Sequence, residues 1–224
     1  MKARIGMVTI GQSPRDDVTP DLEKIWGNGV ELVQKGALDG LALKEIHQMA
    51  PEKGDYALVT RLRDGTQVVI GKRHILGRMQ EKIDELNQQG VNVILLLCTG
   101  EFPEMESRTL IIKPQEVLHK TVAAIAGKKR VGILTPLTRQ MEQARKKWLA
   151  CGVEVETACG SPYTQEKEYL DGVEALSNKN ISLIVMDCMG YTWEMKQKAR
   201  RITDKPIILP RTLIARVINE LLSW

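Results

Sequence analysis

The feature that most constrains this sequence is an internal repeat that relates its two halves. Residues 4–9 (RIGMVT) recur as residues 130–135 (RVGILT), and residues 93–100 (VILLLCTG) are echoed by residues 183–190 (LIVMDCMG). The second pair is an apolar run that ends in Cys-x-Gly. Chance similarity is the alternative, because buried parallel strands all draw on the same few residues. The matched cysteines argue against chance, so we expect two structurally equivalent halves.

Short apolar, β-branched runs alternate with amphipathic stretches, which is typical of parallel strands joined by crossover helices. The fold class predicted is therefore α/β, with two pseudosymmetric three-layer α/β/α domains and mostly parallel sheets. The expected strands are 3–10, 30–35, 91–97, 130–134, 153–157, 181–186 and 206–209. The expected helices are 20–26 with Thr19 as N-cap, 73–89 ended by Gly90, 114–126, 137–150, 165–177 and 191–202.

One segment interrupts this alternation in the first half. Residues 55–62 and 67–71 are extended runs separated by Asp64-Gly65, a strong signal for a hairpin turn. An inserted β-hairpin with its flanking residues accounts for much of the extra length of the first half. We place the first domain at residues 1–110 and the second at residues 111–210.

Composition excludes several classes of protein. A chain of 224 residues with 43% hydrophobic residues can bury a full core. Its longest apolar runs are far short of the roughly 18–20 residues that cross a bilayer, so no membrane segment is expected. The N-terminus lacks the apolar stretch of a secretory signal, which favours a cytoplasmic protein. Four cysteines without a C-x-x-C motif, and three scattered histidines, predict free thiols and no metal site.

The charge distribution does not indicate nucleic-acid binding. The net charge is +4, and the basic clusters at 128–130, 145–147 and 200–201 fall at expected helix ends or on polar helix faces. The chain has one Phe and no nucleic-acid recognition motif. We interpret the clusters as solvated faces.

Cys98 and Cys188 are the candidate catalytic residues, because ligands of open parallel sheets bind beyond the carboxyl ends of the strands. A single cysteine there is more often a small buried hydrophobe, but matched positions in both halves favour a functional pair. Cys151 and Cys159 have no matched partners and are interpreted as structural. Helices starting just after Cys98 and Cys188 would supply dipoles that favour the thiolate.

Two opposed thiols suit proton transfer at a carbon next to a carboxylate. One thiolate removes the proton, the other thiol returns one to the opposite face, and no cofactor is needed. Asp187 opposes this chemistry, since a neighbouring carboxylate raises a thiol pKa, although strand alternation points it away from Cys188. Alternatively, Asp187 is simply a polar residue covered by a helix.

Other strand-end residues are candidates for substrate binding. Gly11, Gln12, Ser13 and Arg15 form a polar loop suited to a carboxylate, with a capping box of Ser13 and Asp16 as the alternative. For Arg211 a surface salt bridge is the more common role, and for Tyr191 packing is. The remaining candidates are Thr99, Gly100, Thr135, Pro136, Met189 and Gly190.

Four stretches resemble the AroM family: 8–17 (VTIGQSPRDD), 97–102 (LCTGEF), 186–191 (MDCMGY) and 209–212 (LPRT). The layout is also distantly similar to the aspartate/glutamate racemase superfamily. That resemblance implies a small carboxylic acid held between paired strand-end cysteines, matching Cys98 and Cys188. It also implies carboxylate contacts from residues 11–13, Thr99 and Thr135-Pro136, a C-terminal helix (211–224) that joins the first domain, and a homodimer.

The sequence departs from amino-acid racemases at three places. They usually carry Asp-Ser after the first strand, Asn-Thr after the first cysteine and Thr-His after the second. Here those places read Gly-Gln-Ser, Thr-Gly and Met-Gly. Since no obvious group orients a substrate ammonium, a plain carboxylate or keto acid fits at least as well.

Three functional hypotheses follow. The first is a cofactor-independent isomerase or racemase that uses Cys98 and Cys188 as an acid/base pair in an interdomain cleft. The second is an isomerase or decarboxylase that uses one cysteine only. The third is a non-catalytic protein that binds a small carboxylate or other metabolite.

Overall fold

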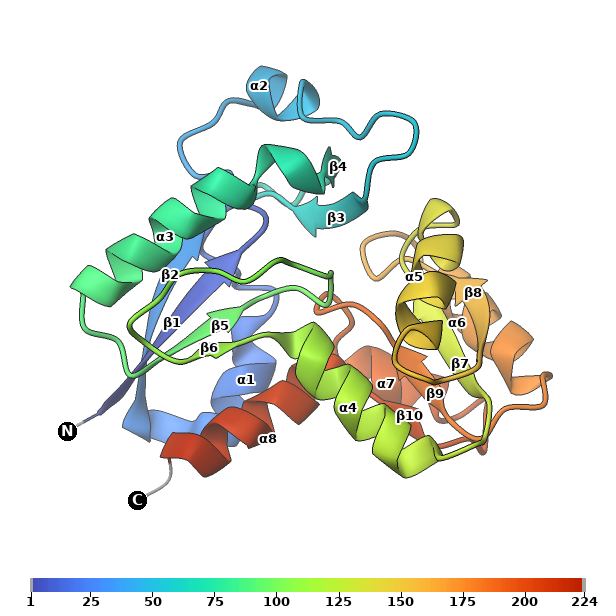
Figure 1. Cartoon of the computed structure of the whole chain (residues 1–224). Coiled ribbons are helices and arrows are strands. Elements are labelled where there is room, and N and C mark those ends of the chain that lie inside the picture. Colours follow the sequence, from blue (N-terminus) through green and yellow to red (C-terminus); the bar gives the residue numbers. More distant parts are fainter. Residues whose placement is uncertain (1, 223–224) are drawn as a thin grey trace. The chain divides into compact units, whose positions relative to one another are not determined.

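The structure, a computed structural model, describes residues 2–222 (Figure 1). Contacts between residues divide the chain into two compact units, which meet in the sequence between Pro114 and Gln115. The C-terminal helix α8 (Pro210–Leu222) is grouped with the second unit up to Leu221, whereas the sequence analysis joined residues 211–224 to the first domain. Residues 223 and 224 of that range lie outside the described part.

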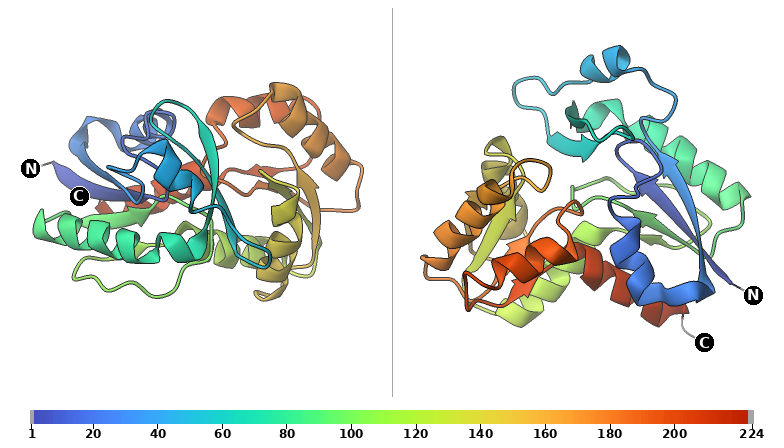
Figure 2. Two further views of the ribbon diagram at one scale, coloured as in Figure 1. Left: turned by 90° about the horizontal axis from the view of Figure 1, so that it is seen from above. Right: turned by 180° about the vertical axis from the view of Figure 1, so that it is seen from behind.

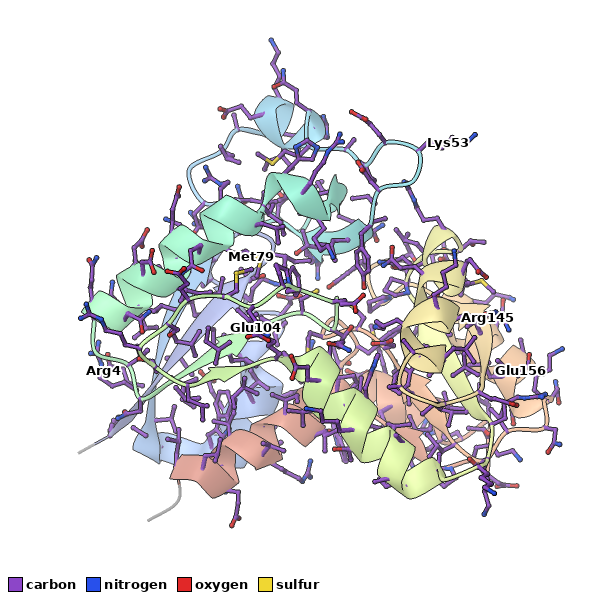
Figure 3. The ribbon with its side chains drawn as sticks, in the orientation of Figure 1. Arg4, Lys53, Met79, Glu104, Arg145 and Glu156 are labelled. Carbon is purple, nitrogen blue, oxygen red and sulfur yellow. The ribbon has the colours of Figure 1, made fainter. Side chains whose placement is uncertain are left out.

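The first unit is built on a four-stranded parallel sheet. Its strand order is β2 (Val30–Gly36), β1 (Ala3–Thr9), β5 (Val93–Leu96) and β6 (Ile111–Ile112). Helices α1 (Thr19–Trp26) and α3 (Leu76–Gln88) cover opposite faces of this sheet (Figures 1 and 2). Met79 of α3 points onto the sheet and is fully buried (Figure 3).

The predicted hairpin is confirmed as β3 (Ala57–Arg61) paired antiparallel with β4 (Gln67–Gly71). Gly65 in its turn has φ of 91°, a conformation that favours glycine. The hairpin packs on the loop after β1, where a Cβ at Gly11 would lie 2.4 Å from the Thr60 Oγ1 atom. The short helix α2 (Leu43–His47) and the 3₁₀ turn Gly27–Gly29 were not predicted. The helix predicted over 73–89 begins later than expected, because Lys72–His74 form a 3₁₀ turn and α3 starts at Leu76.

The second unit also contains a four-stranded parallel sheet, in the order β10 (Ile207–Ile208), β9 (Ile184–Met186), β7 (Val131–Thr135) and β8 (Val155–Cys159). Helices α6 (Glu166–Ser177) and α7 (Trp193–Ala199) pack on the face formed by Leu134, Ile184 and Met186. Helices α4 (Pro114–Ala126) and α5 (Arg139–Leu149) pack on the opposite face, with Ile133 and Val185.

The sequence repeat has the same register in both sheets. Gly6 pairs with Ile94 across β1 and β5, and their repeat equivalents Gly132 and Ile184 pair across β7 and β9. The repeat also continues beyond the motifs found from sequence. Residues 111–114 (IIKP) and 207–210 (IILP) each form a short edge strand followed by a 13-residue helix, α4 or α8. The expectation of equivalent halves is therefore confirmed for the two sheets, whereas some of the connections differ: the hairpin and α2 occur in the first half only.

Some predicted boundaries were wrong. Helix α1 begins at Thr19 with Val18 at its N-cap and no side-chain cap, so Thr19 is a helical residue rather than the cap. Pro20 then occupies the first turn, where a missing N–H costs nothing. Strands β5 and β9 are shorter than the apolar runs that contain them.

Candidate active site

The loop that carries Cys98 leaves the sheet of the first unit in a tight turn. The Leu97 N–H still donates to the Val8 carbonyl of β1 at 2.8 Å, and the Cys98 N–H folds back onto the Leu96 carbonyl at 2.8 Å. The Gly100 N–H then donates to the Cys98 sulfur at 3.2 Å. A donor aimed at sulfur favours the thiolate over the thiol, because it interacts with the charged form more strongly.

The loop that carries Cys188 has the same construction in the second unit. The Asp187 N–H donates to the Leu134 carbonyl of β7 at 2.9 Å, and the Cys188 N–H folds back onto the Met186 carbonyl at 2.8 Å. The Gly190 N–H donates to the Cys188 sulfur at 3.3 Å. Each half therefore presents a partly exposed cysteine at the carboxyl end of a buried strand, and its sulfur accepts a backbone N–H from two residues further on.

The expected helix just after Cys98 was wrong. Residues 97–110 are described throughout and contain no helix. Pro103 explains part of this, since it lacks an N–H and disfavours helical geometry at the preceding residue. After Cys188, α7 begins only at Trp193, where the Thr192 hydroxyl accepts from the Met195 N–H at 3.1 Å. The backbone N–H of each glycine, rather than a helix dipole, is the donor at each sulfur.

The loop after β1 holds a buried arginine. The Arg15 guanidinium makes a two-pronged ion pair with Asp17, at 2.7 and 2.8 Å. It also donates to the Thr9 hydroxyl at 3.2 Å and to the Thr60 hydroxyl of the hairpin at 3.4 Å. Only 3% of Arg15 is exposed. Arg15 thus ties the end of β1 to the hairpin, a contact that the sequence did not reveal.

The polar loop after β1, which was predicted to bind a carboxylate, uses its side chains to form hydrogen bonds with neighbouring loops. The Ser13 hydroxyl and N–H both donate to the Asp39 carboxylate, at 2.6 and 2.8 Å, and the Ser13-Pro14 bond is cis. The Gln12 side chain donates to the Leu41 carbonyl at 3.3 Å and accepts from the Arg63 N–H at 3.1 Å. The alternative capping box is wrong, because Ser13 bonds to Asp39 and α1 starts several residues later.

Equivalent strand-end residues gather in the second unit. The Thr135 hydroxyl oxygen lies 3.3 Å from the carbonyl oxygens of both Leu137 and Ala158, and its single hydrogen is shared between these two acceptors. The Pro136 carbonyl accepts from the Cys159 thiol at 3.6 Å. These contacts close the loop after β7 onto the end of β8.

Arg211 holds the backbone of the Cys188 loop. Its guanidinium donates to the Met189 carbonyl at 2.7 and 3.1 Å and to the Gly190 carbonyl at 3.1 Å. The expected surface salt bridge was wrong, because only 1% of Arg211 is exposed and it lies in the first turn of α8. The sequence placed Arg211 at the correct end of the sheet but missed its attachment to the Cys-x-Gly backbone.

Two tyrosines of the second unit differ in their relation to Cys188. Tyr191 is fully buried, its hydroxyl donates to the Gly160 carbonyl, and burial raises its pKa well above 10. Tyr163, which the sequence analysis did not select, places its hydroxyl 3.9 Å from the Cys188 sulfur. The signal that was available for Tyr163 is its place in a Gly-Ser-Pro turn directly after β8.

Asp187 points to the opposite face of the sheet from Cys188, as strand alternation predicts. Its carboxylate accepts from the Lys147 ammonium and the Trp148 indole of α5, each at 3.0 Å. Burial by itself raises the pKa of Asp187, but the Lys147 charge and these hydrogen bonds outweigh it and hold that pKa below 3.8. Asp187 is therefore an ion-paired residue covered by a helix.

The remaining cysteines have structural surroundings. The Cys151 thiol donates to the Trp148 carbonyl at 3.0 Å, and burial raises its pKa above the ordinary value. Cys159 lies against Pro136, as described above. All four cysteines lie among the described residues and are free thiols. Within residues 2–222, no group of three His, Cys, Asp or Glu side chains is arranged to hold a metal ion.

The predicted site residues thus fall into two sets, one at the carboxyl end of each sheet. The first unit brings together Cys98, Thr99, Gly100 and the loop 11–15. The second brings together Cys188, Met189, Gly190, Arg211 and the loop at 135–136.

None of the helices within residues 2–222 has the length and apolar character needed to span a bilayer.

Solved structures with this architecture include racemases, a maleate isomerase and an arylmalonate decarboxylase. A maleate isomerase from Pseudomonas putida S16 superposes with a TM-score of 0.63 at 13% identity, covering 99% of this chain and 93% of that one. The Picrophilus torridus aspartate racemase gives 0.64 at 11% identity over 98% and 94% of the two chains. A glutamate racemase from Francisella tularensis gives 0.60 at 16% identity over 99% and 81%.

These likenesses define the class of fold, the two-domain α/β architecture of the aspartate/glutamate racemases and maleate isomerase. Among curated proteins no significant sequence match is found. The profile of the AroM protein family matches residues 5–222, and the chain belongs to that family.

Proposed function

We propose that this protein is a cofactor-independent isomerase or racemase that moves a proton at a carbon next to a carboxylate, with Cys98 and Cys188 as its acid/base pair. The observation that carries the proposal is the matched construction of the two loops. Each cysteine follows a central parallel strand, and each sulfur accepts an N–H from the glycine two residues on, at 3.2 and 3.3 Å. The position is one where ligands of parallel sheets bind.

The reaction is balanced by the two sulfurs alone. One thiolate takes the proton, so that a C–H bond breaks, an S–H bond forms and the electron pair passes into the adjacent carboxylate. The other thiol then gives its proton to the opposite face of that carbon, which leaves it as the thiolate. The glycine N–H donors stabilise whichever sulfur is charged. The proposal requires both sulfurs to reach one bound substrate.

The substrate class that we propose is a small carboxylic acid. The solved relatives include one in complex with D-glutamate and others named for aspartate and maleate. Arg15 and Arg211 are committed to Asp17 and to loop carbonyls, so neither guanidinium is placed as the main partner of a substrate. A carboxylate that needs few cationic contacts suits these loops. The free thiols support a reducing compartment such as the cytoplasm.

The test is solvent deuterium exchange on a panel of small carboxylic and keto acids, followed by NMR or mass spectrometry. We expect incorporation by the native protein and a loss of about 100-fold or more in Cys98→Ser and in Cys188→Ser, since each removes one acid/base group. Cys151→Ser and Cys159→Ser are the matched controls and should retain exchange.

The outcomes separate the hypotheses. Retention of turnover in one of the two site variants would support the single-cysteine isomerase or decarboxylase instead. Ligand binding by calorimetry that survives Cys98→Ser/Cys188→Ser, with no exchange on any acid, would support the non-catalytic binding protein.

A further inference from the structure

Tyr163 lies in the loop that joins β8 to α6. Strand β8 pairs with β7, and β7 pairs on its other side with β9, the strand that leads to Cys188. The loop therefore comes from a strand two positions away in the sheet and brings a phenol to the carboxyl end. The Tyr163 hydroxyl oxygen is 3.9 Å from the Cys188 sulfur, within hydrogen-bonding range for sulfur.

The second Cys-x-Gly motif is shaped around this tyrosine. A Cβ at Gly190 would lie 2.4 Å from the Tyr163 hydroxyl oxygen and 2.6 Å from its ring carbon Cζ. Any side chain at 190 would therefore displace the phenol. In the first unit the equivalent Cβ, at Gly100, would meet the Leu58 Cδ2 atom of the hairpin at 2.8 Å. The same glycine position makes room for a polar neighbour in one half and for an apolar one in the other.

A phenol beside a thiolate can only act as the donor, because the thiolate has no hydrogen. The Cys188 sulfur already accepts the Gly190 N–H at 3.3 Å, so the Tyr163 hydroxyl adds a second donor to the same atom. Hydrogen bonds to the charged form of a group favour that form. Other titratable or charged groups around this loop include Tyr191, which interacts electrostatically with Cys188, Cys159 and Asp187, and Arg211, which binds the loop carbonyls.

We propose that Tyr163 is a catalytic residue of the second unit, whose hydroxyl stabilises the Cys188 thiolate by hydrogen bonding to its sulfur. This inference rests on the proposed function for its role in turnover, but the hydrogen bond can be measured without a substrate. When Cys188 carries the proton, the same hydroxyl remains against the sulfur. Tyr163 thus biases Cys188 towards the role of base.

The experiment is alkylation of the intact protein with iodoacetamide across pH, with the rate at each cysteine followed by mass spectrometry. In Tyr163→Phe we expect the midpoint pH of Cys188 alkylation to rise by about half a unit to one unit, the scale of one charge-assisted hydrogen bond. The midpoint at Cys98 should not move. Tyr169→Phe is the matched control, because the Tyr169 hydroxyl is buried and makes no hydrogen bond within the described residues.

A second pair of variants keeps the test independent of Tyr163→Phe. Gly190→Ala, which displaces the phenol, should raise the Cys188 midpoint in the same direction, whereas Gly100→Ala should leave it unchanged. An unchanged Cys188 midpoint in folded Tyr163→Phe, or an equal shift in Tyr169→Phe, would overturn the proposal. A shift at Cys188 together with no exchange on any acid would uphold the Tyr163 contact and refute the isomerase.

Discussion

The two halves share their backbone at the site but differ in what lies directly behind it. The residue before Cys98 is Leu97, which is buried as part of an apolar core. The residue before Cys188 is Asp187, buried against Lys147 with side-chain exposures of 2% and 7%. The backbone N–H of each residue donates to the neighbouring central strand, from Leu97 to β1 and from Asp187 to β7. The turn that presents each cysteine is therefore set by backbone pairing, and the layer behind it can be either hydrophobic or ionic.

The largest effect should come from breaking this buried ion pair. Lys147→Met leaves the Asp187 carboxylate without its cation, and removal of one partner of a buried pair typically costs about 3–5 kcal/mol. Urea unfolding monitored by circular dichroism measures the loss. Lys146→Met is the matched control, because 77% of the Lys146 side chain is exposed and its contact with Glu142 spans 3.8 Å. The control should change stability by less than about 0.5 kcal/mol.

The double variant Lys147→Met/Asp187→Leu makes the second half resemble the first. It should recover most of the stability, since a hydrophobic replacement of a buried ion pair is often neutral. The Trp148 indole N–H would still lose its acceptor. If the double variant were no more stable than Lys147→Met, the comparison of Asp187 with Leu97 would be wrong.

A smaller effect, and one that depends on pH, should come from His119. Its ring stacks on Trp148 with centroids 3.9 Å apart, and burial, helped by the Lys147 charge, lowers its pKa from 6.5 to about 4. Between these values the unfolded chain binds the proton and the folded chain does not. Stability from the neutral ring is therefore complete above pH 6.5 and is lost as the pH falls towards 4, by up to about 3 kcal/mol.

His119→Gln should flatten that dependence. Urea unfolding at a series of pH values from 7 to 4 compares the slopes of the variant and the native protein. His47→Gln, at an exposed position of α2, should retain the native slope. If His119→Gln and the native protein had equal slopes, burial of the neutral His119 ring would not be the cause of the pH dependence.

The sequence was a good guide wherever a periodic pattern or a repeat carried the information. Most strand positions, the hairpin and the equivalence of residues 4–9 with residues 130–135 follow from local hydrophobicity and turn residues, whereas the two-residue strand β6 was missed. The placement of Cys98 and Cys188 at strand ends follows from the same repeat. These features depend on a few neighbouring residues and on the rule that parallel strands end on one side of a sheet.

The contacts of the site were not predictable in the same way. Asp39 reaches Ser13, Thr60 reaches Arg15, and Tyr163 reaches Cys188 across 25 or more positions in the chain. Nothing in the local sequence of either partner indicates such a pairing, because it depends on which loops the sheet order brings together. The helix that was wrongly expected just after Cys98 has a different cause. We expected the same kind of helix after both cysteines, but Pro103 disfavours a helix in the first half.

The smallest effects should test the repeat itself at its central glycines. A Cβ at Gly6 would lie 2.9 Å from the Leu86 Cδ1 atom, and one at Gly132 would lie 2.6 Å from the Ile181 Cδ1 atom. The Gly6 contact is with α3, whereas the Gly132 contacts are with the segment before β9 and, at 3.3 Å, with Leu176 of α6. Both glycines are closely covered, so Gly6→Ala and Gly132→Ala should each cost about 1–3 kcal/mol by overpacking. If the halves are equivalent, the two losses in urea unfolding should agree within about 1 kcal/mol.

Gly77→Ala provides the control of opposite sign. Gly77 lies in α3, a Cβ there would meet no atom within 4 Å, and alanine favours a helix over glycine by about 0.5–1 kcal/mol. A gain in stability at Gly77 together with matched losses at Gly6 and Gly132 attributes those losses to close packing between helix and sheet. A loss at only one of the two sites would mean that the repeat preserves strand register but not the packing of the covering helix.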